Sequence, residues 1–81
     1  MIIITLTKFE YKNKKARYGY VISEEDGVYK EFIDSYSSYD ELKKEVNEDT
    51  IENILCSKHY GIYQLLKEKH QFIFDGKNII I

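Results

Sequence analysis

Three residues of types that bind metals or act in nucleophilic catalysis lie in the second half of the chain: Cys56, His59 and His70. Cys56 and His59 are three residues apart, so on a helix they share a face, as two zinc ligands or a thiol and its base would. Structural zinc needs four ligands, and no second close pair of cysteines or histidines occurs. The pattern also lacks any group to orient a catalytic histidine. We therefore predict no metal, no cofactor and no catalytic residue here.

Carboxylates offer a second kind of chemistry, and their spacing again argues against catalysis. Glu24, Glu25 and Asp26 are consecutive, so their side chains point in different directions and indicate a solvated turn. Asp34 and Asp40 match only a fragment of the carboxylate set of a metal-dependent nuclease. The four glycines form no phosphate-binding pattern. The chain is predicted not to be an enzyme.

The first 36 residues predict a meander of three antiparallel strands. Alternating β-branched and aromatic residues occupy 2–11, 17–23 and 28–36, and polar turns at 12–15 and 24–27 separate them. Gly27 suits a turn that needs a positive φ. Ile2, Ile4 and Leu6 share one face, whereas Phe9 falls in the opposite phase. A bulge near Thr7 and Lys8 would reconcile the two phases.

Helical signals follow from Ser38 to about residue 69. Ser38 with Glu41 fits a capping box, and apolar residues recur at helical spacing after it. Residues 47–49 interrupt the pattern, and Asp49 can cap a second helix. Gly61 either divides that second helix or only weakens it.

The C-terminal residues predict two more strands, at 71–74 and 78–81, joined by a hairpin turn at Asp75-Gly76. The isoleucine-rich ends of the chain suit adjacent central strands, because such strands would aggregate if exposed. The fold class is therefore α+β, an antiparallel sheet of about five strands in the order β-β-β-α-α-β-β, with the helices packed on one face. Residues 1–81 form a single domain in this interpretation.

Composition limits the classes of protein further. Hydrophobic residues make up 43% and charged residues 32%, which is ordinary for a globular domain. The longest apolar run, residues 1–4, is far short of the roughly 20 residues that span a bilayer. A single cysteine excludes an internal disulfide, and no export signal is visible. We expect a cytoplasmic protein.

Charge is segregated along the chain, although the net charge is only −2. Residues 1–23 carry five basic residues against Glu10, whereas residues 24–52 carry eleven acidic residues against three lysines. This pattern predicts an acidic surface that docks on a basic groove of a larger protein, where its carboxylates could stand in for phosphates. A solvated helix face and a solubilising turn would give the same pattern. The predicted partner-binding residues are Glu24, Glu25, Asp26, Glu31, Asp40, Glu41, Glu45, Glu48, Asp49 and Glu52, with Tyr29, Tyr36 and Tyr39 as aromatic anchors.

Two alternatives remain open from the sequence. Lys12, Lys14, Lys15 and Arg17 form a basic hairpin beside Tyr11, Tyr18 and Tyr20, and lysines with aromatic faces can bind single-stranded nucleic acid. Against this, the chain is acidic overall, and tyrosines that alternate along a strand are more often core residues. Exposed strand edges and a tyrosine-rich face could instead form a homodimer.

No motif connects the chain to a known family. In size and composition, being short, acidic and rich in lysine, glutamate, isoleucine and tyrosine without proline, it resembles the small proteins of phages and mobile elements in AT-rich Gram-positive bacteria. Anti-CRISPR and other anti-defence inhibitors are among them. That resemblance implies stoichiometric binding, often through an acidic surface, in the cytoplasm of a host cell.

Overall fold

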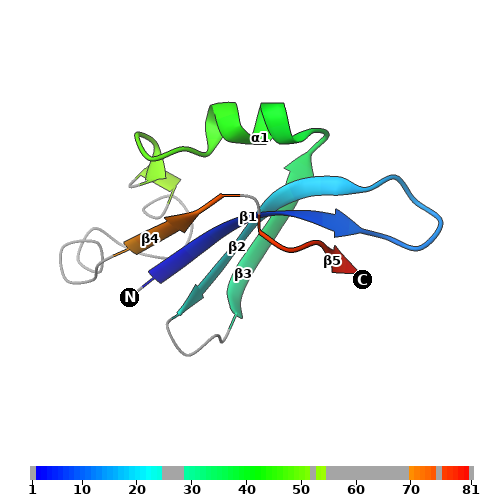
Figure 1. Cartoon of the computed structure of the whole chain (residues 1–81), viewed down its shortest axis with the longest axis horizontal. Helices are drawn as coiled ribbons and strands as arrows, with labels where there is room; N and C mark the ends of the chain where they lie inside the picture. The colour runs from blue at the N-terminus through cyan, green and yellow to red at the C-terminus, as the bar shows by residue number, and fades with distance from the viewer. Residues whose placement is uncertain (1, 25–28, 52, 55–69, 75, 81) are drawn as a thin grey trace.

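The computed structural model describes residues 2–24, 29–51, 53–54, 70–74 and 76–80, which form a mixed α+β fold (Figure 1). The sheet has five strands in the order β3-β2-β1-β4, and β5 also pairs with β1. Within these ranges, no helix is long and apolar enough to cross a membrane. The elements are β1 (Ile2–Glu10), β2 (Arg17–Glu24), β3 (Tyr29–Tyr36), α1 (Tyr39–Glu45), β4 (His70–Ile73) and β5 (Ile79–Ile80).

The antiparallel meander β1-β2-β3 is confirmed, but the bulge expected near Thr7 and Lys8 is wrong. β1 and β2 pair without a register shift from Ile2↔Glu24 to Phe9↔Arg17. The opposite phase of Phe9 has another explanation, because the second face of β1 is also buried at Thr7 and Phe9. Phe9 is 1% exposed and its ring lies 5.4 Å from that of Phe32.

The last two strands depart from the predicted hairpin, because β4 and β5 both run parallel to β1. β4 pairs with the first half of β1 from Ile2↔His70 to Thr5↔Ile73, and β5 pairs with its end at Phe9↔Ile79. Five residues, 74–78, separate the two paired segments against three on β1, so the register along β1 changes between β4 and β5. The sheet is therefore mixed rather than antiparallel. The expectation of adjacent central strands at the two ends of the chain is wrong for the C-terminal strand, because β1 is central whereas β5 pairs only with β1, at Phe9 and Glu10, and Ile80 is 80% exposed.

Gly76 serves as a point of close approach rather than as a hairpin residue. Its amide donates a hydrogen bond to the carbonyl oxygen of Leu6 over 2.6 Å. A Cβ at this position would lie 2.8 Å from the same oxygen and would overlap the Thr5 side chain. The glycine thus lets residues 76–80, which we call the C-terminal segment, lie directly against β1.

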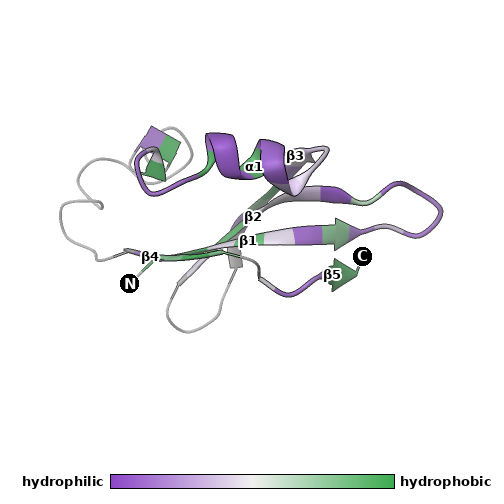
Figure 2. Cartoon of the chain, turned by 45° about the horizontal axis from the view of Figure 1, so that its top comes forward, coloured by the Kyte–Doolittle hydropathy of each residue, from purple (hydrophilic) through white to green (hydrophobic). Residues whose placement is uncertain are grey.

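The main core lies between the sheet and α1, which covers one face (Figure 2). The alternate residues of β1 point to this face, and Ile2, Ile4 and Leu6 are completely buried. Burying side chains of this size contributes about 1.5–3 kcal/mol each, so this stripe is a large part of the stability. The buried cluster consists of Ile2, Ile4, Leu6, Tyr20, Ile22, Leu42, Val46 and Ile51.

The helical region is only partly described. α1 ends at Glu45 because its C-cap, Val46, is extended, with φ −113° and ψ 98°. Helical backbone returns at Ile51, Asn53 and Ile54, where the Ile54 amide donates to the Thr50 carbonyl over 3.1 Å. Thr50, and not Asp49, therefore precedes this turn. The rest of the expected second helix, with Cys56, His59 and Gly61, lies outside the described residues.

A bulge shapes the β3 edge of the sheet. Tyr18 pairs with Tyr36 and Tyr20 with Ile33, so β3 carries an extra residue at Asp34-Ser35. The Arg17 guanidinium donates to the carbonyls of Asp34 (3.2 Å) and Ser35 (2.6 Å), which satisfies backbone acceptors that the bulge removes from the ladder.

Gly19 lies opposite this bulge and generates a test of the fold. A Cβ there would overlap the Ile33 carbonyl oxygen and lie 2.8 Å from the Cα of Asp34. These are backbone atoms, so Gly19→Ala must push β3 away from β2, and we expect a loss of about 1–3 kcal/mol in the free energy of unfolding in urea. Ser35→Ala, at an exposed position of the same bulge, is the control and should change it by less than about 0.5 kcal/mol. Equal stability of the wild type and Gly19→Ala would contradict this geometry.

Candidate protein-binding surface

The residues before α1 form a cap that sets where the helix starts. Ser38 is extended, with φ −151° and ψ 160°, and its hydroxyl oxygen accepts a hydrogen bond from the Glu41 amide over 3.2 Å. The Glu41 carboxylate accepts hydrogen bonds from Ser37, from its amide at 3.2 Å and from its hydroxyl at 2.6 Å. The Ser38 half of the predicted capping box is thus confirmed, whereas Glu41 contacts Ser37 instead of Ser38. The bonds from Ser37 lower the pKa of Glu41.

The inner side of α1 fixes the helix on the sheet. Leu42 and Val46, four residues apart, are both buried. Tyr39 joins them, since its hydroxyl donates to the Leu6 carbonyl over 3.3 Å and its ring lies 5.2 Å from that of Tyr18. The Lys43 ammonium also lies 5.2 Å from the centroid of the Tyr39 ring. Tyr39 therefore attaches the first turn of α1 to β1 and β2.

The outer side of α1 and the turn that follows display carboxylates. Glu41 and Glu45 are four residues apart and occupy one side of the helix. Lys43 and Lys44 interrupt the acidic residues on the remaining exposed positions, so the charge is mixed there. The α1 acidic surface, as we use the term, consists of the exposed residues Asp40, Glu41, Glu45, Glu48 and Asp49.

Tyr36 connects this surface to β3. It is partly buried and packs against the core cluster. Burial, and then a hydrogen bond to the Glu45 carboxylate, raise the pKa of Tyr36 to about 12. Tyr20 is 2% exposed, and its burial raises its pKa to about 12 as well. These phenols stay protonated at neutral pH, so Tyr36 offers an aromatic face and a hydroxyl beside the carboxylates.

The other predicted acidic residues are placed less completely. Glu31 lies on β3 opposite Ile22 and its charge acts on Tyr20, so it belongs to the sheet rather than to α1. Glu24 and Tyr29 belong to β2 and β3, but their side chains are not among those described. Glu25, Asp26 and Glu52 lie outside the described residues.

The basic hairpin lacks most of the aromatic platform that nucleic-acid binding would use. Tyr20 is buried, and Tyr18 packs on Tyr39 and the core cluster. The Tyr11 hydroxyl donates to the Asp34 carboxylate, and Arg17 is occupied by the bulge carbonyls. The hydrogen bonds from Arg17 to the bulge carbonyls were not predicted from the sequence, because no local pattern pairs Arg17 with residues 34 and 35. The exposed cations left in the hairpin are Lys12, Lys14 and Lys15.

No group of three or more histidine, cysteine or acidic side chains is placed to hold a metal ion within the part of the chain that the structure describes. Comparison with protein-family models, curated proteins and solved structures finds no match for this chain. Its function is therefore inferred from its own residues.

The cap of α1 generates a prediction about helix stability. Ser38→Ala removes the oxygen that accepts from the Glu41 amide, and we expect a loss of about 1 kcal/mol in the free energy of unfolding in urea. Ser38→Asp keeps an acceptor at the N-cap and should stay within about 0.5 kcal/mol of the wild type. A Ser38→Ala protein as stable as the wild type would show that the cap does not stabilise α1.

The Tyr36 environment generates a prediction about alkaline pH. The pKa of about 12 in the folded chain exceeds the ordinary value of 10.0, so the folded chain keeps a proton that the unfolded chain releases. The stabilising contribution of this group is complete below about pH 10 and is lost as the pH rises to about 12. Tyr36→Phe removes that loss, so its stability should fall less steeply with pH than that of the wild type.

Urea denaturation at several pH values between about 9 and 12 measures this difference. Glu45→Gln is the companion variant, because it removes the carboxylate that contributes to the raised pKa. The fall of its free energy of unfolding between about pH 9 and 12 should be intermediate between those of Tyr36→Phe and the wild type. Parallel stability curves for Tyr36→Phe and the wild type would contradict the pKa assignment.

Proposed function

We propose that this chain is a non-enzymatic protein-binding module that inhibits a larger protein by stoichiometric binding through the α1 acidic surface. The observation that carries the proposal is the display of five exposed carboxylates along a seven-residue helix and its following turn. Buried Leu42 and Val46 hold this helix on the sheet. The carboxylates are therefore presented on a fixed support, which lowers the entropy lost on binding.

Electrostatics determine which partner fits. The five carboxylates outnumber the two lysines of α1, so this surface is negative overall, and a negative surface attracts a positively charged groove, speeds association and disfavours acidic partners. Grooves of that kind bind nucleic acid, and carboxylates at similar spacing can occupy the positions of phosphates. We therefore propose a nucleic-acid-binding partner, such as a host defence nuclease inhibited in the manner of anti-CRISPR proteins of phages, in the cytoplasm of the host cell.

The tyrosines supply the apolar part of such a contact. Tyr36 lies beside Glu45 and is partly exposed, so a partner side chain can pack on its ring while a basic group pairs with the carboxylate. Tyr29 is a second proposed anchor. Binding through α1 uses no catalytic group in this proposal. Two of its carboxylates, Glu41 and Glu45, are held in place by Ser37 and Tyr36.

Charge reversal of the α1 acidic surface tests the proposal. Asp40→Lys, Glu48→Lys and Asp49→Lys together leave the contacts of Glu41 and Glu45 in place, and they should weaken partner binding at least about tenfold. The matched control reverses the same number of charges on the basic hairpin: Lys12→Glu, Lys14→Glu and Lys15→Glu. Circular dichroism and urea denaturation establish that both variants are folded.

The assay captures partners from a lysate of an AT-rich Gram-positive bacterium with tagged wild-type protein, with and without nuclease treatment. We expect one protein in stoichiometric amount that survives nuclease, that the α1 variant loses and that the hairpin variant retains. Reversal of Glu24, Glu25 and Asp26 to lysine should also weaken its binding without unfolding the chain. Recovery that disappears with nuclease, or with the hairpin variant alone, would replace this proposal with nucleic-acid binding.

A further inference from the structure

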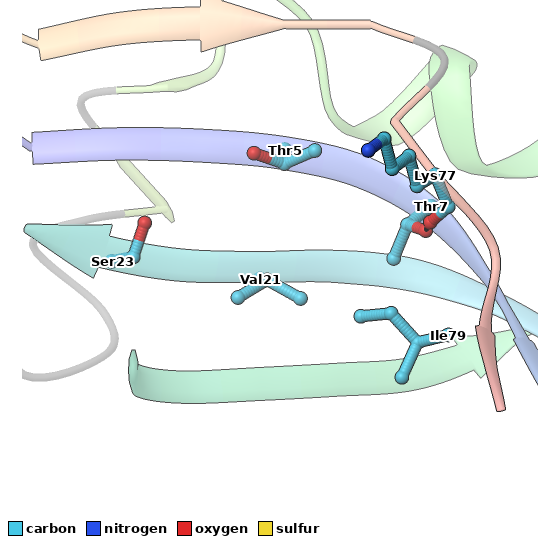
Figure 3. Close-up of a pocket in the computed structure, with 6 residues that line it drawn as sticks. All are labelled: Thr5, Thr7, Val21, Ser23, Lys77 and Ile79. Carbon is cyan, nitrogen blue, oxygen red and sulfur yellow. Dashed lines mark hydrogen bonds between the residues drawn. The ribbon is translucent and has the colours of Figure 1, made fainter. Parts of the chain in front are cut away.

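The sheet face opposite α1 contains a hollow of about 240 Å³ (Figure 3). Thr5 and Thr7 of β1 and Val21 and Ser23 of β2 form its floor, and they alternate with residues of the main core. Lys77 and Ile79 form the wall. The hollow therefore lies between the sheet and residues 76–80, on the sheet face that α1 does not cover.

The wall is fixed to the floor by three contacts. The Gly76 amide donates to the Leu6 carbonyl over 2.6 Å, and the Thr7 hydroxyl donates to the Lys77 carbonyl. Ile79 pairs with Phe9 in the sheet. Thr7 is 1% exposed, so its hydrogen bond is shielded from water. These contacts preorganise the hollow, so a ligand entering it does not need to order the C-terminal segment.

Besides the Thr7 hydroxyl, which donates to the Lys77 carbonyl, the lining combines one cation and two further hydroxyl groups with apolar surface. In Figure 3 the Lys77 side chain runs along β1 with its ammonium group toward Thr5, whereas Ser23 lies at the other end of the hollow, beyond Thr5. Within the described part of the chain, no hydrogen bond or ion pair engages these three polar groups. Ile79 and the 5% of Val21 that is exposed supply the apolar part. One positive charge beside the Thr5 hydroxyl is suited to a carboxylate.

An exposed aromatic ring continues the apolar part beyond the hollow. Phe32 on β3 pairs with Val21 in the sheet and is 53% exposed. Its ring lies 5.4 Å from that of the buried Phe9, which holds it on this face. An apolar group bound over Val21 would therefore extend toward Phe32 and remove part of that surface from water.

We propose that this hollow binds a small carboxylate with a short apolar or aromatic tail. The carboxylate accepts hydrogen bonds from the Lys77 ammonium and the Thr5 hydroxyl, and the tail lies against Ile79 and extends toward Phe32. About eight water molecules fill the same volume, so the ligand is on the size scale of benzoate. The site is independent of the α1 acidic surface, and either assignment can fail without the other.

Titration of the full chain with sodium benzoate, followed by amide chemical shifts in 15N-labelled protein, tests the proposal. We expect saturable shifts at residues 5–7, 21–23 and 76–79, with a Kd on the order of 1 mM for so small a ligand. Benzyl alcohol has the same ring without the charge and should bind at least about tenfold more weakly. Sodium hexanoate should bind at the same residues.

Variants distinguish a built site from weak binding elsewhere. Lys77→Gln removes the cation at an exposed position and should raise the Kd for benzoate about tenfold. Lys14→Gln removes a cation from the hairpin and should leave the Kd unchanged. Shifts confined to other residues, or equal affinity in Lys77→Gln and the wild type, would overturn the proposal. So would a concentration-dependent dimer that covers this face and does not respond to benzoate, measured by sedimentation.

Discussion

The central position of β1 is the constraint on which the rest of the structure depends. β1 pairs with β2 along one edge and with β4 and then β5 along the other, so its backbone groups are satisfied on both sides. One face of its first half is completely buried at Ile2, Ile4 and Leu6, and the other face is buried at Thr7 and Phe9. A strand paired on both edges and packed under α1 needs a continuous apolar phase, which Ile2, Ile4 and Leu6 supply, whereas its second phase includes Thr5 and Thr7.

Each face of the sheet then acquires a different chemistry. On one face, α1 contributes Leu42 and Val46 to the core and leaves its carboxylates in solvent. On the other face the C-terminal segment covers only part of the sheet, so hydroxyls, Lys77 and Phe32 remain accessible. A helix with one apolar side necessarily presents its polar side outward, whereas a segment held by a few hydrogen bonds leaves space beside it. The proposed protein-binding surface therefore lies on the helix that covers one face, and the proposed carboxylate site lies beside the segment that partly covers the other.

The β3 edge is shaped in a way that limits pairing with another strand. Register shifts occur at two places between β2 and β3, and Arg17 occupies the carbonyls of Asp34 and Ser35 at one of them. Bulges and occupied carbonyls interrupt the row of free backbone groups that an added strand would need. A homodimer built by extending the sheet at this edge is therefore disfavoured, and side-chain surfaces such as α1 carry the interaction in our proposal.

The sequence by itself determined the parts that depend on short-range signals: the three-stranded meander, the start of α1 at the Ser38 cap and the exposure of Asp40, Glu41, Glu45, Glu48 and Asp49. Alternation, turns and caps are encoded within a few residues. Only the tertiary structure decided that β4 and β5 run parallel to β1, that Phe9 packs on the second face and that Tyr39 supports the helix. Strand direction depends on which distant segment offers a partner, and the Asp75-Gly76 turn signal is overridden because Gly76 can lie against Leu6. The hollow joins Thr5 to Lys77, which are far apart in sequence, so no local pattern could have revealed it.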